Sequence, residues 1–287
     1  MATAVALVDD PDGVRRDALA RYGRLVEQVR SYREAGDYPR AEAVALAALG
    51  AVEQALGPAT VELVSVLNEL GIIGKYRGDF DDAERHYRRA LSIHESNGVV
   101  ASASVAAILH NLGGLAHARG DADTAEPLAR RGIAVREVLA DMDPLALAAD
   151  RAALAAILID AGKRDDARAL LQNVLKDYER IYGPVHYEVS VVLHNLGSLQ
   201  YRDGDVARAA TTLRQAAAMK SAVLGPGHPD LAITLYNLAC CTLDLGDVEE
   251  AITHLGRAVD LLDAAVSPAQ PTLVACRAKL EQLLPPR

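Results

Sequence analysis

The sequence contains few aromatic residues and few cysteines. Only 4% of its 287 residues are aromatic, with ten Tyr, one Phe and no Trp. Strands of β-sandwiches and barrels favour aromatic and β-branched residues, so this composition argues against an all-β fold. The three cysteines, Cys240, Cys241 and Cys276, are an odd number and form no disulfide framework. We therefore expect a reducing, cytoplasmic environment.

Positive charge and membrane-spanning segments are also scarce. The net charge is −9 at pH 7, which argues against a nucleic-acid groove or an anionic membrane surface. The first 13 residues contain three Asp and no basic residue, so they do not form a signal peptide. Residues 96–118 lack Asp, Glu, Lys and Arg but include Asn, Gly and His, which argues against a membrane span. The sequence therefore predicts neither a nucleic-acid partner nor a membrane partner.

What the sequence does contain is an internal repeat. Ala and Leu dominate a chain that is 51% hydrophobic, which favours helices. A glycine recurs every 42 residues and an alanine follows each one by five positions: Gly36–Ala41, Gly78–Ala83, Gly120–Ala125, Gly162–Ala167, Gly204–Ala209 and Gly246–Ala251. Glycine ends a helix by adopting the left-handed conformation, and the small alanine lets two helices pack closely. Each unit is thus predicted to hold two antiparallel helices, helix A before the glycine and helix B after it.

The predicted helices follow from this register. Helices A are expected at 14–35, 60–77, 101–119, 144–161, 187–203 and 229–245, and helices B at 39–55, 81–96, 123–140, 165–181, 207–223 and 249–264. A last helix, at about 269–284, is expected to cap the C-terminal end. Residues 1–13 are predicted to be a flexible tail, and residues 14–287 one continuous domain. The predicted fold is all-α, an open superhelix of about six helix-turn-helix repeats plus the capping helix.

The repeat resembles the tetratricopeptide repeat. The motif Leu67–Leu70–Gly71 followed by Ala83, Tyr87 and Ala90 matches that family's signature in order, and three later repeats match at the same register. The 42-residue length, the loop sequence Leu-Gly-Pro-Gly-His-Pro-Asp at 224–230 and the motif Leu-His-Asn-Leu-Gly at 109–113 and 193–197 resemble kinesin light chain and its bacterial relatives. The resemblance covers about residues 14–284. It implies a right-handed α-solenoid whose helices A line a concave groove, and a non-enzymatic scaffold or adaptor that binds proteins or peptides.

One stripe of helix A positions is expected to face this groove. The predicted groove residues are Asn68, Lys75, His110, Asn111, His117, His194, Asn195, Tyr201, Arg202, Tyr236 and Asn237. Asparagine is unfavourable inside a helix, so its recurrence at one register requires a cause. The resemblance implies that Asn111, Asn195 and Asn237 hold the main chain of an extended peptide. The alternative is that these amides bridge neighbouring helices.

The third repeat, counted from the helix at 60–77, interrupts the stripe. Arg151 replaces a recurrent leucine and Ala153 replaces the recurrent asparagine. A possible pocket for an apolar group or small molecule is lined by small residues: Ala149, Ala152, Ala153 and Ala156. In the alternative interpretation the repeat is merely degenerate, with Arg151 and Asp150 as a surface ion pair.

No motif predicts catalysis, a metal or a cofactor. The sequence lacks His-x-x-x-His and Cys-x-x-Cys pairs, a phosphate loop, a dinucleotide fingerprint and a Gly-x-Ser-x-Gly elbow. Arginines of helices B, Arg136 among them, are expected on the outer surface. The inner positions that grip a terminal carboxylate in co-chaperone tetratricopeptide domains contain no Lys here, so that function is not expected. Two alternatives to a peptide-binding scaffold remain: a small-molecule site, sensory or catalytic, at the third-repeat gap, and self-association into a homodimer through the terminal helices.

Overall fold

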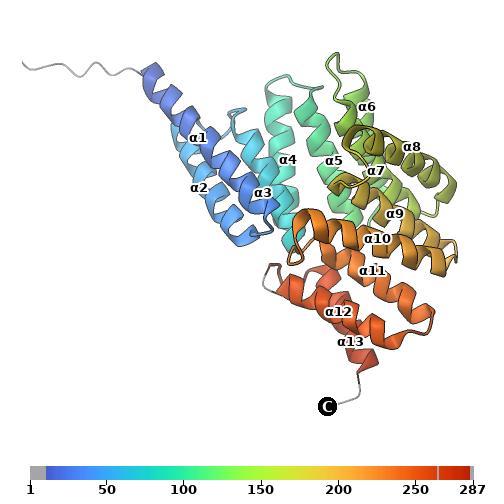
Figure 1. Cartoon of the computed structure of the whole chain (residues 1–287). Coiled ribbons are helices and arrows are strands. Elements are labelled where there is room, and N and C mark those ends of the chain that lie inside the picture. The colour runs from blue at the N-terminus through green and yellow to red at the C-terminus, as the bar shows by residue number, and fades with distance from the viewer. Residues whose placement is uncertain (1–10, 264, 285–287) are drawn as a thin grey trace, which may run out of the picture.

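The computed structural model describes residues 11–263 and 265–284, and within them every regular element is an α-helix (Figure 1). The helices are α1 (Pro11–Glu34), α2 (Tyr38–Leu56), α3 (Leu63–Arg77), α4 (Phe80–Ser96), α5 (Ala103–Ala118), α6 (Ala122–Glu137), α7 (Pro144–Asp160), α8 (Arg164–Tyr182), α9 (Tyr187–Arg202), α10 (Val206–Leu224), α11 (Leu231–Asp244), α12 (Val248–Asp263) and α13 (Pro271–Leu283). Each predicted helix is present, with ends that lie within three residues of the expected ones. Most of the predicted tail, residues 1–10, lies outside the described residues.

The recurrent glycines and alanines perform the predicted roles. All six glycines of the register have positive φ, between 75° and 87°. Four of the following helices start with an aspartate side chain that accepts a hydrogen bond from the helix backbone, as Asp121 does from Thr124 at 3.1 Å. The six register alanines are fully buried. The spacing thus encodes both the turn inside each repeat and the closest point of contact between helices A and B.

Helices A form the inner layer of a superhelix, and helices B form the outer layer. The odd-numbered helices α1 to α11 each contact the next odd-numbered helix, whereas in the described residues no two helices B approach one another as closely. Apolar side chains fill the space between the two layers along the whole array. The expected all-α superhelix with a C-terminal capping helix is confirmed.

Successive turns of the superhelix touch each other, so the prediction of an open superhelix is wrong. The imidazole Nε2 of His228, before α11, donates to the carbonyl of Glu34 at 2.9 Å, since its Nδ1 accepts from Asp230 N. A Cβ atom on Gly36 would lie only 2.7 Å from Cδ of Pro229. Further along, Ser267 N donates to Arg77 O at 2.8 Å. Curvature is the sum of small rotations at each repeat interface, which the spacing of glycines does not encode.

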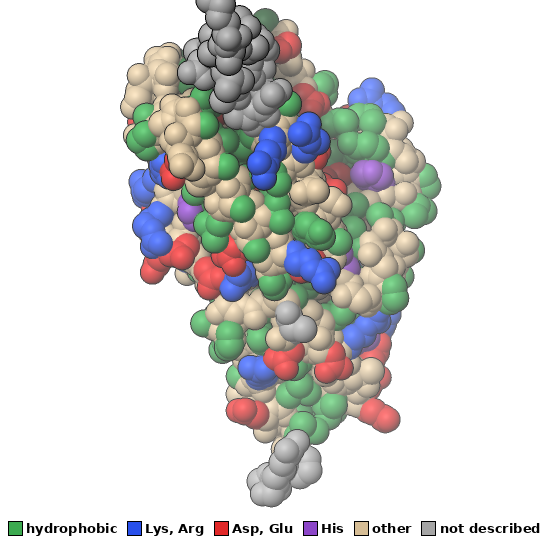
Figure 2. Space-filling model, turned by 90° about the vertical axis from the view of Figure 1, so that its left-hand side faces the viewer, with side chains coloured by type: hydrophobic (Ala, Val, Ile, Leu, Met, Phe, Trp, Pro, Cys, Tyr) green, Lys and Arg blue, Asp and Glu red, His purple; other side chains and the backbone are tan. Residues whose placement is uncertain are grey.

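The outer surface carries both signs of charge close together. Figure 2 shows Lys and Arg interspersed with Asp and Glu over one face. Many of these side chains pair between neighbouring repeats, as Arg214 does with Glu250 at 2.8 Å. Such exposed pairs contribute little stability. The face in view therefore has no extended patch of a single sign.

Candidate ligand-binding lumen

The closed turn of helices A surrounds a lumen made of three connected cavities, which we name after one lining residue each. The Asn compartment, about 480 Å³, includes Asn195 and Asn237. The Lys compartment, about 370 Å³, includes Lys75, and the Glu compartment, about 560 Å³, includes Glu188. The Asn and Lys compartments share the lining residues His117, Asp160 and Ile233. The Lys and Glu compartments share Tyr38, Tyr76 and Asp230.

Most of the predicted groove residues meet in one compartment. Seven of them line the Asn compartment: His117, His194, Asn195, Tyr201, Arg202, Tyr236 and Asn237. Lys75 lines the Lys compartment, next to His117. Asn68, His110 and Asn111 line none of the three compartments. The helix A stripe therefore converges on the lumen mainly through α9 and α11.

The recurrent asparagines bridge neighbouring helices A. Their amide nitrogens donate to the preceding helix A: Asn111 to Asn68 Oδ1 at 2.8 Å, Asn195 to Ala152 O at 3.3 Å, and Asn237 to Ser198 Oγ at 3.0 Å. These bonds account for the asparagines without any ligand, because each one ties two repeats together. Contact with a peptide main chain stays a prediction.

The basic side chains His117 of α5 and Arg202 of α9 are already paired. His117 Nε2 lies 2.6 Å from an oxygen of Asp160, and the Arg202 guanidinium bonds the other oxygen. The hydrogen bond from His117 and the nearby Arg202 hold the pKa of Asp160 below its usual range. Tyr201 donates to Asp244 at 2.7 Å in the same manner, which raises the pKa of its hydroxyl. These polar groups are therefore fixed before any ligand binds.

A second anchor lies between α9 and α11. Asp230 accepts from Tyr187 at 3.0 Å and from Lys220 at 3.0 Å. His194 Nδ1 lies 3.1 Å from Thr234 Oγ1, and burial together with Lys220 lowers the pKa of His194 to about 3. His194 is therefore neutral at pH 7. The sequence contained one hint of Asp230, the His-Pro-Asp ending of its loop, but nothing that placed it in the lumen.

Lys75 differs from the other basic groups of the lumen. Among the described residues its side chain has no hydrogen bond and no ion pair. Its ammonium lies against α5 where Gly114 leaves space, since a Cβ there would be 2.8 Å from Nζ. Burial lowers the pKa of Lys75, and Asp230 partly opposes this effect. Beside it, the rings of Tyr38 and Tyr76 stack at 5.5 Å.

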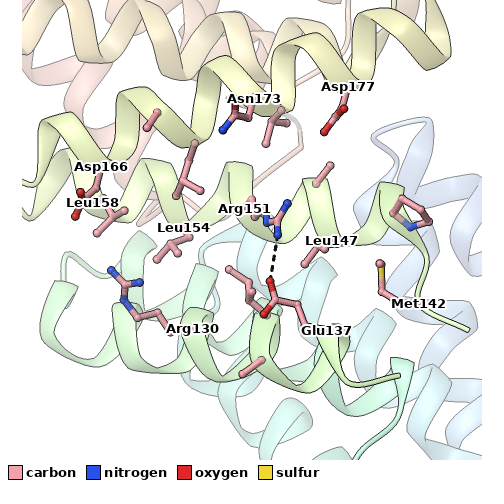
Figure 3. A pocket seen from close by; sticks show the side chains of 17 residues that line it. Arg130, Glu137, Met142, Leu147, Arg151, Leu154, Leu158, Asp166, Asn173 and Asp177 are labelled. Carbon is pink, nitrogen blue, oxygen red and sulfur yellow. Dashed lines mark hydrogen bonds and ion pairs between the residues drawn. The ribbon is translucent and has the colours of Figure 1, made fainter. Parts of the chain in front are cut away.

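The third repeat, α7–α8, opens on the convex face instead of the groove. A cavity of about 1050 Å³ is lined by residues of α6, α7 and α8. Figure 3 shows α7 between the other two helices. Arg151 lies in the cavity and donates to Glu137 at 3.1 Å. Of the predicted pocket residues, Ala156 lines the Asn compartment, Ala152 is buried, and Ala149 and Ala153 are half-buried. A pocket made by these alanines stays a prediction.

The surface pair of Asp150 with Arg151 and the surface position expected for Arg136 are both wrong. Asp150 is buried and accepts from Arg136 Nε at 2.6 Å, while its other oxygen lies 2.8 Å from His110 Nδ1. Arg136 is therefore buried as well, although it belongs to a helix B. A carboxylate taken out of water needs a close cationic partner, which the Arg136 guanidinium provides, and His110 adds a second polar contact. Arg151, expected as the partner of Asp150, points away to Glu137.

Fold and lumen together define a helical-repeat protein with a concave binding surface. Sequence profiles described as tetratricopeptide repeat match residues 25–96 and 145–222, 194–268 and 105–140. The chain belongs to the tetratricopeptide repeat family, as the resemblance predicted. A search of curated proteins gives no match. In the described residues no helix is long and apolar enough to cross a membrane, and no three His, Cys, Asp or Glu side chains form a metal-binding group.

Solved structures with the same fold include kinesin light chain-like and peptide-bound proteins. BtubC (BKLC) from P. vanneervenii is 24% identical, with a TM-score of 0.51 over 87% of this chain and 91% of that one. NprR in complex with its cognate peptide NprX is 15% identical, with a TM-score of 0.69 over 97% and 73%. A Rap protein complexed with Competence and Sporulation Factor is 13% identical, with a TM-score of 0.62 over 92% and 87%. At these identities the likeness concerns the fold.

Proposed function

We propose that the chain is a non-enzymatic scaffold that binds a peptide or an extended protein segment in its lumen. The observation that carries this proposal is the meeting of seven groove residues in the Asn compartment. Tyr236 and the partly exposed edges of Tyr201 and His194 supply contact surface there, beside amides and an Arg–Asp pair. The fold shared with NprR, solved in complex with its cognate peptide, and with a Rap protein, solved in complex with Competence and Sporulation Factor, supports the same use of the concave side.

The polar groups of the lumen favour binding over catalysis. Asp160, Asp244 and Asp230 are held in ion pairs or hydrogen bonds, and His194 is a neutral group bonded to a threonine. The free thiols of the three cysteines have raised pKa values because they are buried, so they are poor nucleophiles. Free cysteines also support the proposed cytoplasmic location.

A displayed library of random peptides, panned on the immobilised chain, tests the proposal. We expect enriched peptides that bind the parent chain and fail to bind Ala156→Phe, because a ring at this half-buried position of α7 fills the Asn compartment. Ala218→Phe is the matched control, since Ala218 is exposed on α10. Both variants must keep the helical circular dichroism of the parent. Peptides that bind Ala156→Phe and the parent equally would exclude the lumen as their site.

Self-association is the second candidate, and it has its own signature. The terminal helix α13 exposes Val274 and α1 exposes one side at the opposite end of the array. A homodimer through these helices predicts a sedimentation coefficient that depends on protein concentration and that falls on substitution Val274→Glu. A single coefficient at all concentrations would exclude it.

A further inference from the structure

We propose that the Lys compartment binds a carboxylate attached to an apolar group, and that the Lys75 ammonium is the receptor for this carboxylate. The proposal deepens the proposed function, because it assigns a ligand chemistry to one part of the same lumen. It starts from a difference between Lys75 and the equivalent residues of other repeats.

Polar side chains of the inner stripe bond to the residue 43 positions later in the chain. His117 bonds Asp160 and Tyr201 bonds Asp244, both across this separation. Lys75 occupies the same register as His117 and Tyr201, one or three repeats earlier. The residue 43 positions after Lys75 is Ala118, which has no group that accepts a hydrogen bond from its side chain. Lys75 therefore occupies a register at which other repeats form a polar pair, but the acceptor that would complete this pair is absent at position 118.

The other basic side chains of the lumen are engaged by carboxylates of the chain. Arg202 and His117 are both bonded to Asp160, Lys220 is bonded to Asp230, and Arg33, which lines the Glu compartment, is bonded to Glu69. His194 is uncharged at neutral pH because burial lowers its pKa to about 3. A carboxylate that enters the lumen therefore finds its counter-charge at Lys75.

The carboxylates Asp160 and Asp230 restrict where this anion can lie. Both line the Lys compartment, and both would repel a second carboxylate near them. The ammonium of Lys75 lies against Gly114 of α5, and in the described residues it forms no ion pair with either carboxylate. The ligand anion is therefore expected next to this ammonium, near Ala118, which lines the compartment. Its charge would also raise the depressed pKa of Lys75 towards the ordinary value.

Apart from Gln270 and Thr272, the remaining walls of the compartment are mainly apolar and fit a hydrocarbon group next to the carboxylate. They come from residues of four helices and a loop: Phe80, Ile233, Leu262, Val266 and Pro271. The cavity of about 370 Å³ is at the small end of ligand pockets. It suits one branched side chain with its carboxylate better than a whole folded element. Two sources provide this chemistry, the C-terminal residue of a peptide and a free apolar acid.

This site differs in position from the terminal-carboxylate grip of co-chaperone repeats. The register of that grip in this chain is occupied by Asn68, His110, Ala152, His194 and Tyr236. Lys75 lies two helical turns beyond Asn68, at the end of α3 next to the contact between superhelical turns. The receptor is therefore created by the closure of the superhelix.

N-acetyl-leucine and its amide, N-acetyl-leucinamide, test the proposal as probes that differ in charge at one group. The chain has only five lysines, Lys75, Lys163, Lys176, Lys220 and Lys279, so ¹³C-dimethylated lysine signals are few and assignable by substitution. We expect the acid to shift the Lys75 signal and to raise its pKa, and the amide to bind about tenfold to hundredfold more weakly. Equal binding of acid and amide overturns the proposal.

Substitutions at Lys75 and at Ala118 test whether Lys75, and no other group of the lumen, is the carboxylate receptor. Lys75→Met should abolish the preference for the acid, while Lys163→Met, which removes an exposed lysine paired with Glu126, should keep it. Ala118→Asp should also abolish the preference for the acid, because the new carboxylate forms an ion pair with Lys75 and takes the place of the ligand. Ala118→Asn is its uncharged control and should retain acid binding. A preference for the acid that survives Ala118→Asp refutes the assignment of Lys75.

A last experiment distinguishes a peptide C-terminus from a free acid as the ligand. It also separates the inference about Lys75 from the proposed peptide-binding function. Peptides selected on the parent chain are compared with their C-terminal amides. Weaker binding of the amides, lost in Lys75→Met, assigns the compartment to peptide C-termini. If the selected peptides do not depend on a free C-terminus but N-acetyl-leucine still requires Lys75, the compartment belongs to a free acid. If neither depends on Lys75, this inference fails and the peptide-binding function stands.

Discussion

The second and third repeats use the same helix A register in opposite ways. In α5, Ile108 and Leu109 are fully buried and pack between the two layers. Forty-two residues later, α7 carries Asp150 and Arg151 at these positions. Asp150 is nearly as buried as Ile108, with 4% of its surface exposed against 0%, but it is held by Arg136 and His110. One repeat thus has an apolar layer where its neighbour has an ionic one.

The difference shows which surface a substitution in helix A affects. Arg151 extends towards Glu137 of α6 and leaves the large convex cavity where Leu109 fills the corresponding space. The asparagine ladder, in contrast, is interrupted at Ala153 on the other side of α7, and Asn195 compensates by donating to the main-chain oxygen of Ala152. Departures from the repeat consensus therefore alter the outer face and the lumen independently.

Exchanging the two residues should have the largest effect. Leu109→Arg places a charge in a fully buried apolar layer with no carboxylate, and we expect the free energy of unfolding to fall by about 4 kcal/mol or more. Arg151→Leu removes only an exposed ion pair and covers apolar surface in the cavity, so stability should rise by up to about 1 kcal/mol. Urea denaturation measures both. A loss of stability in Arg151→Leu would show that the arginine is structural.

The next largest effect is expected from the buried ion pair of Asp150 and Arg136 in the third repeat. Asp150→Ala leaves the buried Arg136 guanidinium without its carboxylate, and the free energy of unfolding should fall by about 3 kcal/mol. Glu137→Ala removes the exposed partner of Arg151 in the same region and should cost less than about 1 kcal/mol. Similar losses in the two variants would mean that Asp150 is hydrated despite its burial.

These contacts mark the limit of what the sequence predicts. Glycine and alanine spacing located every helix within three residues, because turn conformation and close helix packing depend on local residue type. The lumen stripe followed from helical periodicity, and seven of its residues do meet. The partners of Asp150, the role of Asp230 and the contact of His228 with Glu34 depend on curvature and on side-chain direction across repeats. No short-range pattern contains that information.

The comparison extends to pH through Ala152. This residue of α7 corresponds to His110 in α5 and to His194 in α9, so the third repeat lacks the imidazole that its two neighbours carry at this register. The pKa of His194 is lowered to about 3 in the folded chain, whereas an unfolded histidine has a pKa near 6.5. Below pH 6.5 the unfolded chain therefore binds a proton at this residue that the folded chain does not bind. Stability should therefore decrease as pH falls below 6.5, by at most about 1.4 kcal/mol per pH unit from this residue. Urea midpoints of His194→Gln should depend less on pH between 6.5 and 4.5, whereas an unchanged slope would contradict a neutral His194.

The smallest effect concerns the second repeat and its missing acceptor. Ala118→Asp gives Lys75 the partner that Asp160 gives His117, and we expect a gain of up to about 1 kcal/mol, because the half-buried pair stays in contact with water. The gain should vanish above the Lys75 pKa, since a neutral amine no longer attracts the carboxylate. Ala118→Asn controls for helix propensity and for side-chain volume. If both variants change the urea midpoint alike at every pH, Lys75 does not lie within reach of residue 118. The absence of an acceptor at position 118 would then not explain why Lys75 is unpaired.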